Sequence, residues 1–272
     1  TRRIQKPVTQ PTITLIQPSQ VKKLKIIGTG HNIDLSKYNN FYVGFEFEFA
    51  PADLSRTLRE TIAHYGVNDG KTGGISRVNK IIRLADGGSI TVPVEDNLYN
   101  HDKIVTQVYY DGSVGVEVVT RPLHFKSLDK AKEVFDYCKT KGNLKTNKAG
   151  LHMTFLLDWH KELSDFDLPV VKNLIQMVRT YYKPIVHMFK QSNRGTGFRI
   201  INPYASMQDP VHNTTHHNAI APRQNEGKVW AIEIRLPDGT DNWEMVKKQV
   251  LFYSALIRHC AEIKENIRLN VA

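Results

Sequence analysis

The chain has 272 residues, of which 40% are hydrophobic and 24% charged, and its formal net charge at pH 7 is +10. This length supports one large domain or two small ones with a substantial buried core. The apolar runs are only a few residues long, which excludes a membrane span of about 20 residues, and two cysteines are too few for a disulfide framework.

The positive charge is concentrated near the N-terminus, where residues 1–40 contain seven Lys or Arg side chains and one acid. We therefore divide the chain into a basic N-terminal arm, residues 1–40, and one folded domain, residues 41–272. The arm is interpreted either as a contact for nucleic acid or another acidic partner, or as a loosely ordered, solubilising extension. No apolar leader is visible and both cysteines are expected to be reduced core residues, which together predict a cytoplasmic protein.

In the first half of the chain, hydrophobic patterning predicts strands at residues 21–27, 41–49, 78–84, 89–94 and 103–110. Leu54, Leu58 and Ile62 recur at helical spacing, and Gly66 is placed to end that helix. The turn expected at residues 86–88, with the sequence Asp-Gly-Gly, would join two of these strands into a hairpin.

In the second half, the patterning predicts strands at 114–120, 151–157 and 229–236, and helices at 128–141, 168–190 and 243–263. Ser127 is the expected N-cap and Gly142 the expected stop of the first of these helices. Pro184 is expected to kink the second helix, and residues 191–227 are predicted to be irregular. Strands that do not alternate regularly with helices indicate an α+β fold rather than a doubly wound parallel sheet.

Four of the predicted strands have one apolar face and one face that carries charge. Alternate side chains of a strand point to opposite sides of a sheet, and in residues 41–49 the odd positions are all apolar whereas the even positions include Glu46 and Glu48. The same separation places four further side chains on polar faces: Glu117, His152, Glu233 and Arg235. In the last strand the apolar face is formed by Trp230, Ile232, Ile234 and Leu236.

These polar faces admit two interpretations. A solvated face is common in antiparallel sheets, but it normally mixes Lys, Thr, Ser and Gln, and crowded carboxylates repel one another unless a cation is present. We therefore favour a divalent-metal site, and its candidate ligands are Glu46, Glu48, Glu117, His152 and Glu233. Oxygen ligands with a single nitrogen indicate Mg²⁺ or Mn²⁺ rather than zinc.

Four motifs carry a resemblance to a known family. In chain order they are residues 44–48 (GFEFE), 111–123 (DGSVGVEVVTRPL), 150–152 (GLH) and 233–240 (EIRLPDGT). Their order and spacing resemble the amidoligase family within the glutamine synthetase and glutamate–cysteine ligase superfamily. The resemblance covers most of the chain, residues 41–262.

The resemblance implies a curved antiparallel funnel, with helices on its outer face, that holds ATP and Mg²⁺ (or Mn²⁺). It also implies an ATP-dependent carboxylate–amine ligase that forms an amide or isopeptide bond through an acyl phosphate. In such a reaction, metals that bridge phosphoryl oxygens neutralise the developing charge. By position, Glu48 and Glu117 would hold one metal, and Asp111 would be a further ligand or would support one. The second metal would be held by Glu46, His152 and Glu233.

Four further residues are expected to contact anionic groups or the substrate. Arg235 would reach the transferred phosphoryl group as a fixed positive charge, beside Glu233. Arg194 and Arg199 are candidates for nucleotide phosphate or substrate carboxylate, although ordinary surface arginines would fit the same pattern. Asn218 occupies the place where related amidoligases often have an Asn ahead of the final strand.

The sequence departs from the family pattern at position 154, where many amidoligases have a second histidine and this chain has Thr. The main alternative to an enzyme is a catalytically degenerate relative, acting as a structural or binding component of a larger assembly that the basic arm enters. A nucleic-acid binder rests on the charge of the arm alone. Zinc binding by His212, His216 and His217 is disfavoured because a fourth ligand is missing.

Overall fold

The computed structural model describes residues 26–28, 33–66, 80–83, 89–92, 104–146, 148–158, 163–189, 218–263 and 265–267. Most of the basic arm, Arg194, Arg199, the three loop histidines and the turn at 86–88 lie outside the described residues. In the part of the chain that is described, no helix combines the length and the apolar character that a membrane crossing requires.

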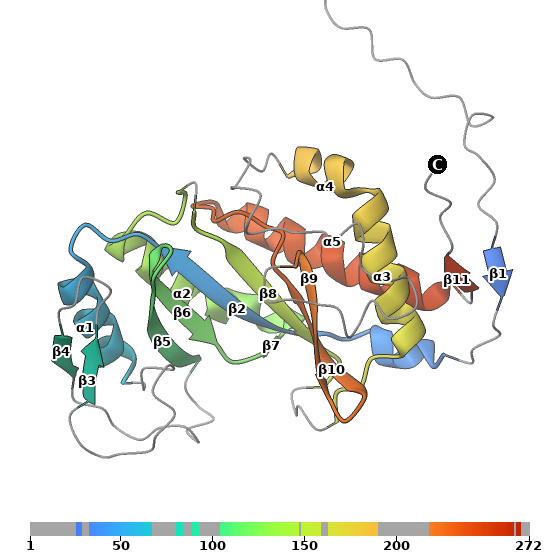
Figure 1. Cartoon of the computed structure of the whole chain (residues 1–272), viewed down its shortest axis with the longest axis horizontal. Helices are drawn as coiled ribbons and strands as arrows, with labels where there is room; N and C mark the ends of the chain where they lie inside the picture. Colours follow the sequence, from blue (N-terminus) through green and yellow to red (C-terminus); the bar gives the residue numbers. More distant parts are fainter. Residues whose placement is uncertain are drawn as a thin grey trace, which may run out of the picture.

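The centre of the fold is an open antiparallel sheet of seven strands (Figure 1). Its order is β5 (Val105–Asp111), β6 (Gly115–Thr120), β2 (Tyr42–Phe49), β8 (Leu151–Leu156), β10 (Lys228–Ile234) and β9 (Ile220–Asn225), and the short β7 (Leu123–His124) also pairs with β2. Strand β2 therefore lies in the interior of the sheet, between β6 and β8. The predicted α+β class is confirmed.

Within the described residues, five helices accompany the sheet: α1 (Leu54–Tyr65), α2 (Leu128–Lys141), α3 (Leu168–Thr180), α4 (Tyr182–Met188) and α5 (Trp243–Glu262). Two 3₁₀ turns, η2 (Leu35–Tyr38) and η3 (Phe125–Ser127), precede β2 and α2. Two small antiparallel pairs complete the described structure: β1 (Ile26–Gly28) with β11 (Glu265–Ile267), and β3 (Lys80–Arg83) with β4 (Ser89–Val92). In Figure 1, α2 and α5 run along the same side of the sheet.

The helices cover the apolar face of β2. Phe45 contacts the ring of Trp243 on α5, and Phe47 contacts Phe135 on α2. All five odd-numbered side chains from Phe41 to Phe49 are buried in one hydrophobic core. Because each buried Phe contributes roughly 1.5–3 kcal/mol, this face fixes the register of β2, and a shift by one residue would turn the glutamates into the hydrophobic core.

The ends of the helices follow local chemistry. The side chain of Asp53 accepts a hydrogen bond from the backbone N–H of Arg56 and begins α1, while Gly66 ends it with a left-handed φ of 56°, as its glycine predicts. Ser127 stands at the N-cap of α2, but its side chain makes no capping hydrogen bond. The reason is that η3 runs directly into α2, so the extended backbone that a capping serine normally adopts is absent.

Residues 168–190 do not form the single kinked helix that was predicted. Helix α3 ends at Thr180, Tyr181 intervenes with φ −101° and ψ 21°, and α4 starts at Tyr182. Pro184 explains the break, because it has no N–H to donate to the carbonyl of Thr180 and its ring would clash with that carbonyl. Within the first turn of α4 the same missing N–H has no cost.

Two further predictions about the C-terminal strands were wrong. Residues 220–225, expected to be irregular, form the strand β9, which pairs with β10. Pro222 is tolerated there because β9 is an edge strand of the sheet. The pairing also shifts by one residue between Val229 and Ala231, so the bulge at Trp230 places Val229, rather than Trp230, in the core.

Candidate metal centre

The register of the sheet brings the predicted ligands together from four strands. Glu48 on β2 is opposite Glu117 on β6, and Glu46 is opposite His152 on β8. On the far side of β8, Thr154 is opposite Glu233 of β10. All these side chains lie on the face of the sheet opposite the phenylalanines, because the period of a strand is two residues.

Glu46, His152 and Glu233 form a compact group whose ligand atoms all lie within 4.8 Å of one another. The Nδ1 atom of His152 lies 2.7 Å from Oε2 of Glu46 and 3.9 Å from Oε1 of Glu233. The side chain of Glu233 is 0% exposed, and that of His152 is 2% exposed. Two carboxylates and an imidazole this close together form a set of donors that fits a divalent cation.

Glu48 and Glu117 form a second, adjacent group. The backbone N–H of Gly150 donates to Oε2 of Glu48 at 2.6 Å, while Oε1 of Glu48 lies 3.3 Å from Nε2 of His152. His152 therefore lies between Glu46 and Glu48, with one ring nitrogen near each carboxylate. A neutral imidazole can donate a proton to only one of them.

Two of these acids, Glu117 and Glu46, have raised pKa values. Burial raises the pKa of Glu117 to about 9, and the charges of Glu46, Glu48 and Asp111 act in the same direction. Burial also raises the pKa of Glu46, although Arg235 and Arg223 oppose this shift. Burial is thus the main cause of both shifts, and for Glu117 the neighbouring negative charges add to it.

Two arginines contact Glu233. Arg235, the residue after the end of β10, donates to Oε1, and Arg223, from β9, donates to Oε2. Burial opposes the charged form of Arg235, but the carboxylates of Glu233, Glu46 and Glu48 outweigh it and raise the pKa of the guanidinium. Because the ion pairs span two strands, both oxygens of Glu233 have fixed directions.

The sequence prediction did not include Arg223, since residues 191–227 were taken as irregular. A signal was nevertheless present in the turn that follows β9. Glu226 and Gly227 both have positive φ, 49° and 79°, and they join Asn225 to Lys228 in a two-residue loop. A short Asn-Glu-Gly segment before a predicted strand is typical of such a hairpin.

The charges of the centre do not cancel. Four glutamates, Glu46, Glu48, Glu117 and Glu233, face the guanidiniums of Arg223 and Arg235, which leaves two excess negative charges if all six side chains are ionised. Protonation, as the raised pKa values indicate, is one way to remove this excess. A divalent cation is the other, and oxygen-rich donors suit Mg²⁺ or Mn²⁺.

Two predicted residues have additional structural roles. Oδ1 of Asp111 accepts hydrogen bonds from the backbone N–H groups of Ser113 and Val114, at 2.7 and 3.1 Å, and from the hydroxyl of Ser113. Asp111 therefore shapes the turn between β5 and β6 and acts on Glu117 through its charge. Asn218 is buried just before β9, and its neighbour Ala219 accepts a hydrogen bond from the backbone N–H of Arg235 at 2.9 Å.

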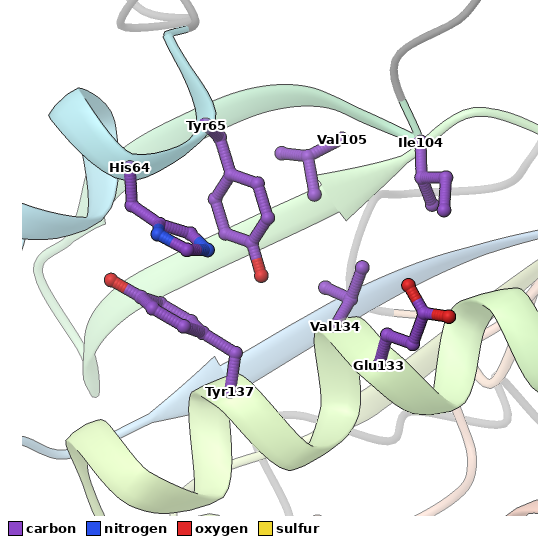
Figure 2. Close-up of a pocket in the computed structure, with 7 residues that line it drawn as sticks. All are labelled: His64, Tyr65, Ile104, Val105, Glu133, Val134 and Tyr137. Atoms are coloured by element: carbon purple, nitrogen blue, oxygen red, sulfur yellow. The ribbon is translucent and has the colours of Figure 1, made fainter.

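A separate cavity of about 350 Å³ lies between α1, α2 and the start of β5 (Figure 2). Figure 2 shows the rings of His64 and Tyr137 face to face, with centroids 4.2 Å apart. The lining residues Val105 and Val134 belong to the hydrophobic core, so this cavity is on the helix-covered side of the sheet. None of the candidate metal ligands lines it.

Together the fold and the site define an α+β protein with a carboxylate-rich centre on one face of an open antiparallel sheet. The model of the family described as "Putative amidoligase enzyme" matches residues 39–215. The match spans more than half of the chain, and the chain belongs to this family. The family name suggests a ligase enzyme, and the matched segment contains Glu46, Glu48, Glu117 and His152 but ends before Glu233. No curated protein matched the chain.

Proposed function

We propose that the protein is an ATP- and Mg²⁺-dependent carboxylate–amine ligase that forms an amide or isopeptide bond. The observation that carries this proposal is the buried group of Glu46, His152 and Glu233, whose ligand atoms lie within 4.8 Å of one another beside Arg235. Membership of an amidoligase family supports the type of bond formed. We also propose that the sheet is the base of a funnel of the glutamine synthetase and glutamate–cysteine ligase type.

The residues fit two adjacent divalent cations, Mg²⁺ or Mn²⁺. Glu46, His152 and Glu233 would hold one ion, and Glu48 and Glu117 the other, with Asp111 as a further ligand or a support for Glu117. When bound, such ions neutralise the charge that develops on a transferred phosphoryl group. The backbones of β2 and β8 are held in place because the apolar side chains on their opposite face are packed in the hydrophobic core. This gives the ligands on the two strands a rigid base.

The proposed reaction has two steps. A carboxylate oxygen of the substrate attacks the γ-phosphorus of ATP, the bond to ADP breaks, and an acyl phosphate forms. An amine then attacks the acyl carbon, inorganic phosphate leaves, and the amine loses a proton. Arg235 is the proposed contact for the transferred phosphoryl group, because it is fixed next to Glu233 and remains only 18% exposed.

Asn218, Arg194 and Arg199 are proposed to contact the nucleotide or the substrate carboxylate. For Asn218 the support is its position. It is buried just before β9, and the carbonyl of the next residue, Ala219, accepts a hydrogen bond from the backbone N–H of Arg235. The acid and the amine are proposed to be small molecules or peptides. A ligase that consumes ATP is expected to act in the cytoplasm, and the basic arm is proposed to contact an acidic partner or a larger assembly.

One observation favours a second candidate, a degenerate relative with a structural or binding role. Both carboxylate oxygens of Glu233 are contacted by arginines, and a buried ion-pair network of this kind can persist without a metal. The retention of all five candidate ligands and of Arg235 favours the enzyme, because a protein with only a structural role would have no need for the whole set.

The proposal is tested by measuring ADP release with Mg²⁺, ATP and pools of amino acids and amines. We expect turnover in the wild-type protein and its loss in Glu233→Gln, which removes a ligand charge. Glu60→Gln is the matched control, because Glu60 pairs with Arg56 and Lys141 on the surface away from the centre. No ADP release from any pool, together with no ATP-dependent thermal shift, would contradict the ligase.

A further inference from the structure

The carboxylate of Glu233 is held from two directions by arginines that differ in their environment. Arg235 follows Glu233 by two residues, directly after the end of β10, and its side chain is paired with the carboxylate of Glu233. Arg223 comes from the edge strand β9, where it is opposite Ala231, while Glu233 is opposite Ala221. Arg223 and Glu233 are therefore diagonal neighbours across the β9–β10 pair, within reach of a long side chain.

The two arginines also use different oxygens of Glu233. Arg235 donates to Oε1, the oxygen that lies 3.9 Å from His152 Nδ1, and Arg223 donates to Oε2. The side chain of Arg223 is 42% exposed, against 18% for Arg235. A movement of the guanidinium of Arg223 away from Glu233 would therefore keep it hydrated, because water already reaches much of it.

We propose that Arg223 is a second anion-binding residue of the centre, paired with Glu233 while the metal sites are free and transferred to an oxyanion of the bound substrate or nucleotide once they are filled. This inference rests on the proposed function, since it assumes that divalent cations bind at Glu46, His152 and Glu233. A cation at that position repels both guanidiniums. Of the two, Arg223 lies at the edge of the sheet and can turn outward.

The chemistry of the ligand follows from the guanidinium group. Its planar donors match the two oxygens of a phosphoryl group or a carboxylate, and lysine at the same place would supply charge without that geometry. Both kinds of anion occur in the proposed reaction. The two sources are distinguished by testing a non-hydrolysable ATP analogue and glutarate, a dicarboxylate, as separate probes.

The test compares Arg223→Gln with the wild-type protein in two binding measurements. In the first, Mn²⁺ is added alone and the free ion is measured by electron paramagnetic resonance. We expect Mn²⁺ to bind about 3- to 10-fold more tightly to the variant, because a competing positive charge is gone. With Mg²⁺ at saturation, calorimetry should show about 10- to 100-fold weaker binding of one of the two anionic probes.

Two further variants serve as controls. Arg223→Lys should keep wild-type Mn²⁺ affinity and recover part of the anion affinity. Arg56→Gln removes an arginine from a surface ion pair with Glu60, away from the centre, and should change neither measurement. Thermal unfolding of each variant establishes that it is folded.

The expected changes in Arg223→Gln have opposite signs, tighter Mn²⁺ binding and weaker anion binding, and this separates the proposed role from a merely structural one. If Arg223 only supported Glu233, Arg223→Gln would weaken Mn²⁺ binding, and that result would overturn the inference, as would unchanged binding of both anionic probes. The proposed function would survive either result as long as Glu233→Gln greatly weakens Mn²⁺ binding. Absence of Mn²⁺ binding to the wild-type protein would overturn both.

Discussion

Glu48 and Glu117 are directly opposite one another on neighbouring antiparallel strands, β2 and β6, and both are buried. Like charges in this position destabilise a sheet, and the pKa of Glu117 is raised to about 9 by burial and by the neighbouring acids. The pair is therefore unfavourable for folding unless a proton or a cation is shared. Its presence in the interior of the sheet is most simply explained by metal binding.

The stability of the metal-free protein should depend on pH with a definite sign. The pKa of Glu117 is about 9 in the folded chain, against an ordinary value of 4.5. Between pH 4.5 and pH 9, the folded state therefore keeps a proton on Glu117 that the unfolded state has lost. The free energy of unfolding should thus fall as pH rises from 4.5 toward 9. Urea unfolding in chelator at pH 6 and pH 8.5 measures this, and Glu117→Gln should make the decrease shallower. A wild-type decrease that persists unchanged in Glu117→Gln would contradict it.

Divalent cations should stabilise the folded chain. At a metal concentration of about 100 times Kd, linkage gives about 2.7 kcal/mol, which corresponds to a rise in Tm of roughly 5–10 °C in a domain of this size. Mg²⁺ and Mn²⁺ should raise Tm in the wild-type protein, and a chelator should reverse the effect. The increase in Tm should be clearly smaller in Glu46→Gln, which disrupts one of the two sites, and unchanged in Glu60→Gln; an equal increase in both variants would place the ions elsewhere.

Metal binding should release protons near neutral pH. Glu117 is protonated there in the metal-free protein because its pKa is raised to about 9, and a carboxyl group must lose its proton to bind a metal. Calorimetric titrations with Mn²⁺ at pH 7.5, in buffers that differ in ionisation enthalpy, should show the release, and the apparent affinity should increase up to about pH 9. Binding without any dependence on the buffer would exclude Glu117 as a ligand.

Gly239 should tolerate no side chain. A Cβ at this position would overlap the carbonyl oxygen of Leu144 and lie 3.0 Å from Cβ of Ala149. Ala149 precedes Gly150, whose backbone N–H donates to Glu48. Gly239→Ala should therefore destabilise the protein by about 1–3 kcal/mol and weaken Mn²⁺ binding through Glu48. Denaturant unfolding and metal titration check both effects, and a variant with wild-type values in both would show that this close packing is unimportant.

The sequence was sufficient for features that depend on local periodicity. Alternation along residues 41–49 predicted which side chains face the core, and Gly66 predicted the end of α1. The break between α3 and α4 could have been predicted from Pro184, since the carbonyl that its ring would meet belongs to Thr180, four residues earlier. Its position was missed because apolar residues continue at helical spacing across it.

Features that depend on pairing between distant segments were beyond such reasoning. Nothing local specifies that Glu46 is opposite His152, 106 residues away, because strand order arises from the packing of the whole sheet. The bulge at Trp230 reverses the local alternation, so parity alone assigned that residue to the wrong face. Arg223 was missed for a related reason, since an edge strand with Pro222 has a polar, irregular sequence.

The number of Mn²⁺ ions bound per chain in the presence of a non-hydrolysable ATP analogue tests the central claim most directly. We expect saturable binding of two ions by the wild-type protein, one in Glu117→Gln, and a large loss of affinity in Glu233→Gln. Stoichiometry and affinity that are the same in all three proteins, or no saturable binding by the wild type, would contradict a metal centre on this face of the sheet.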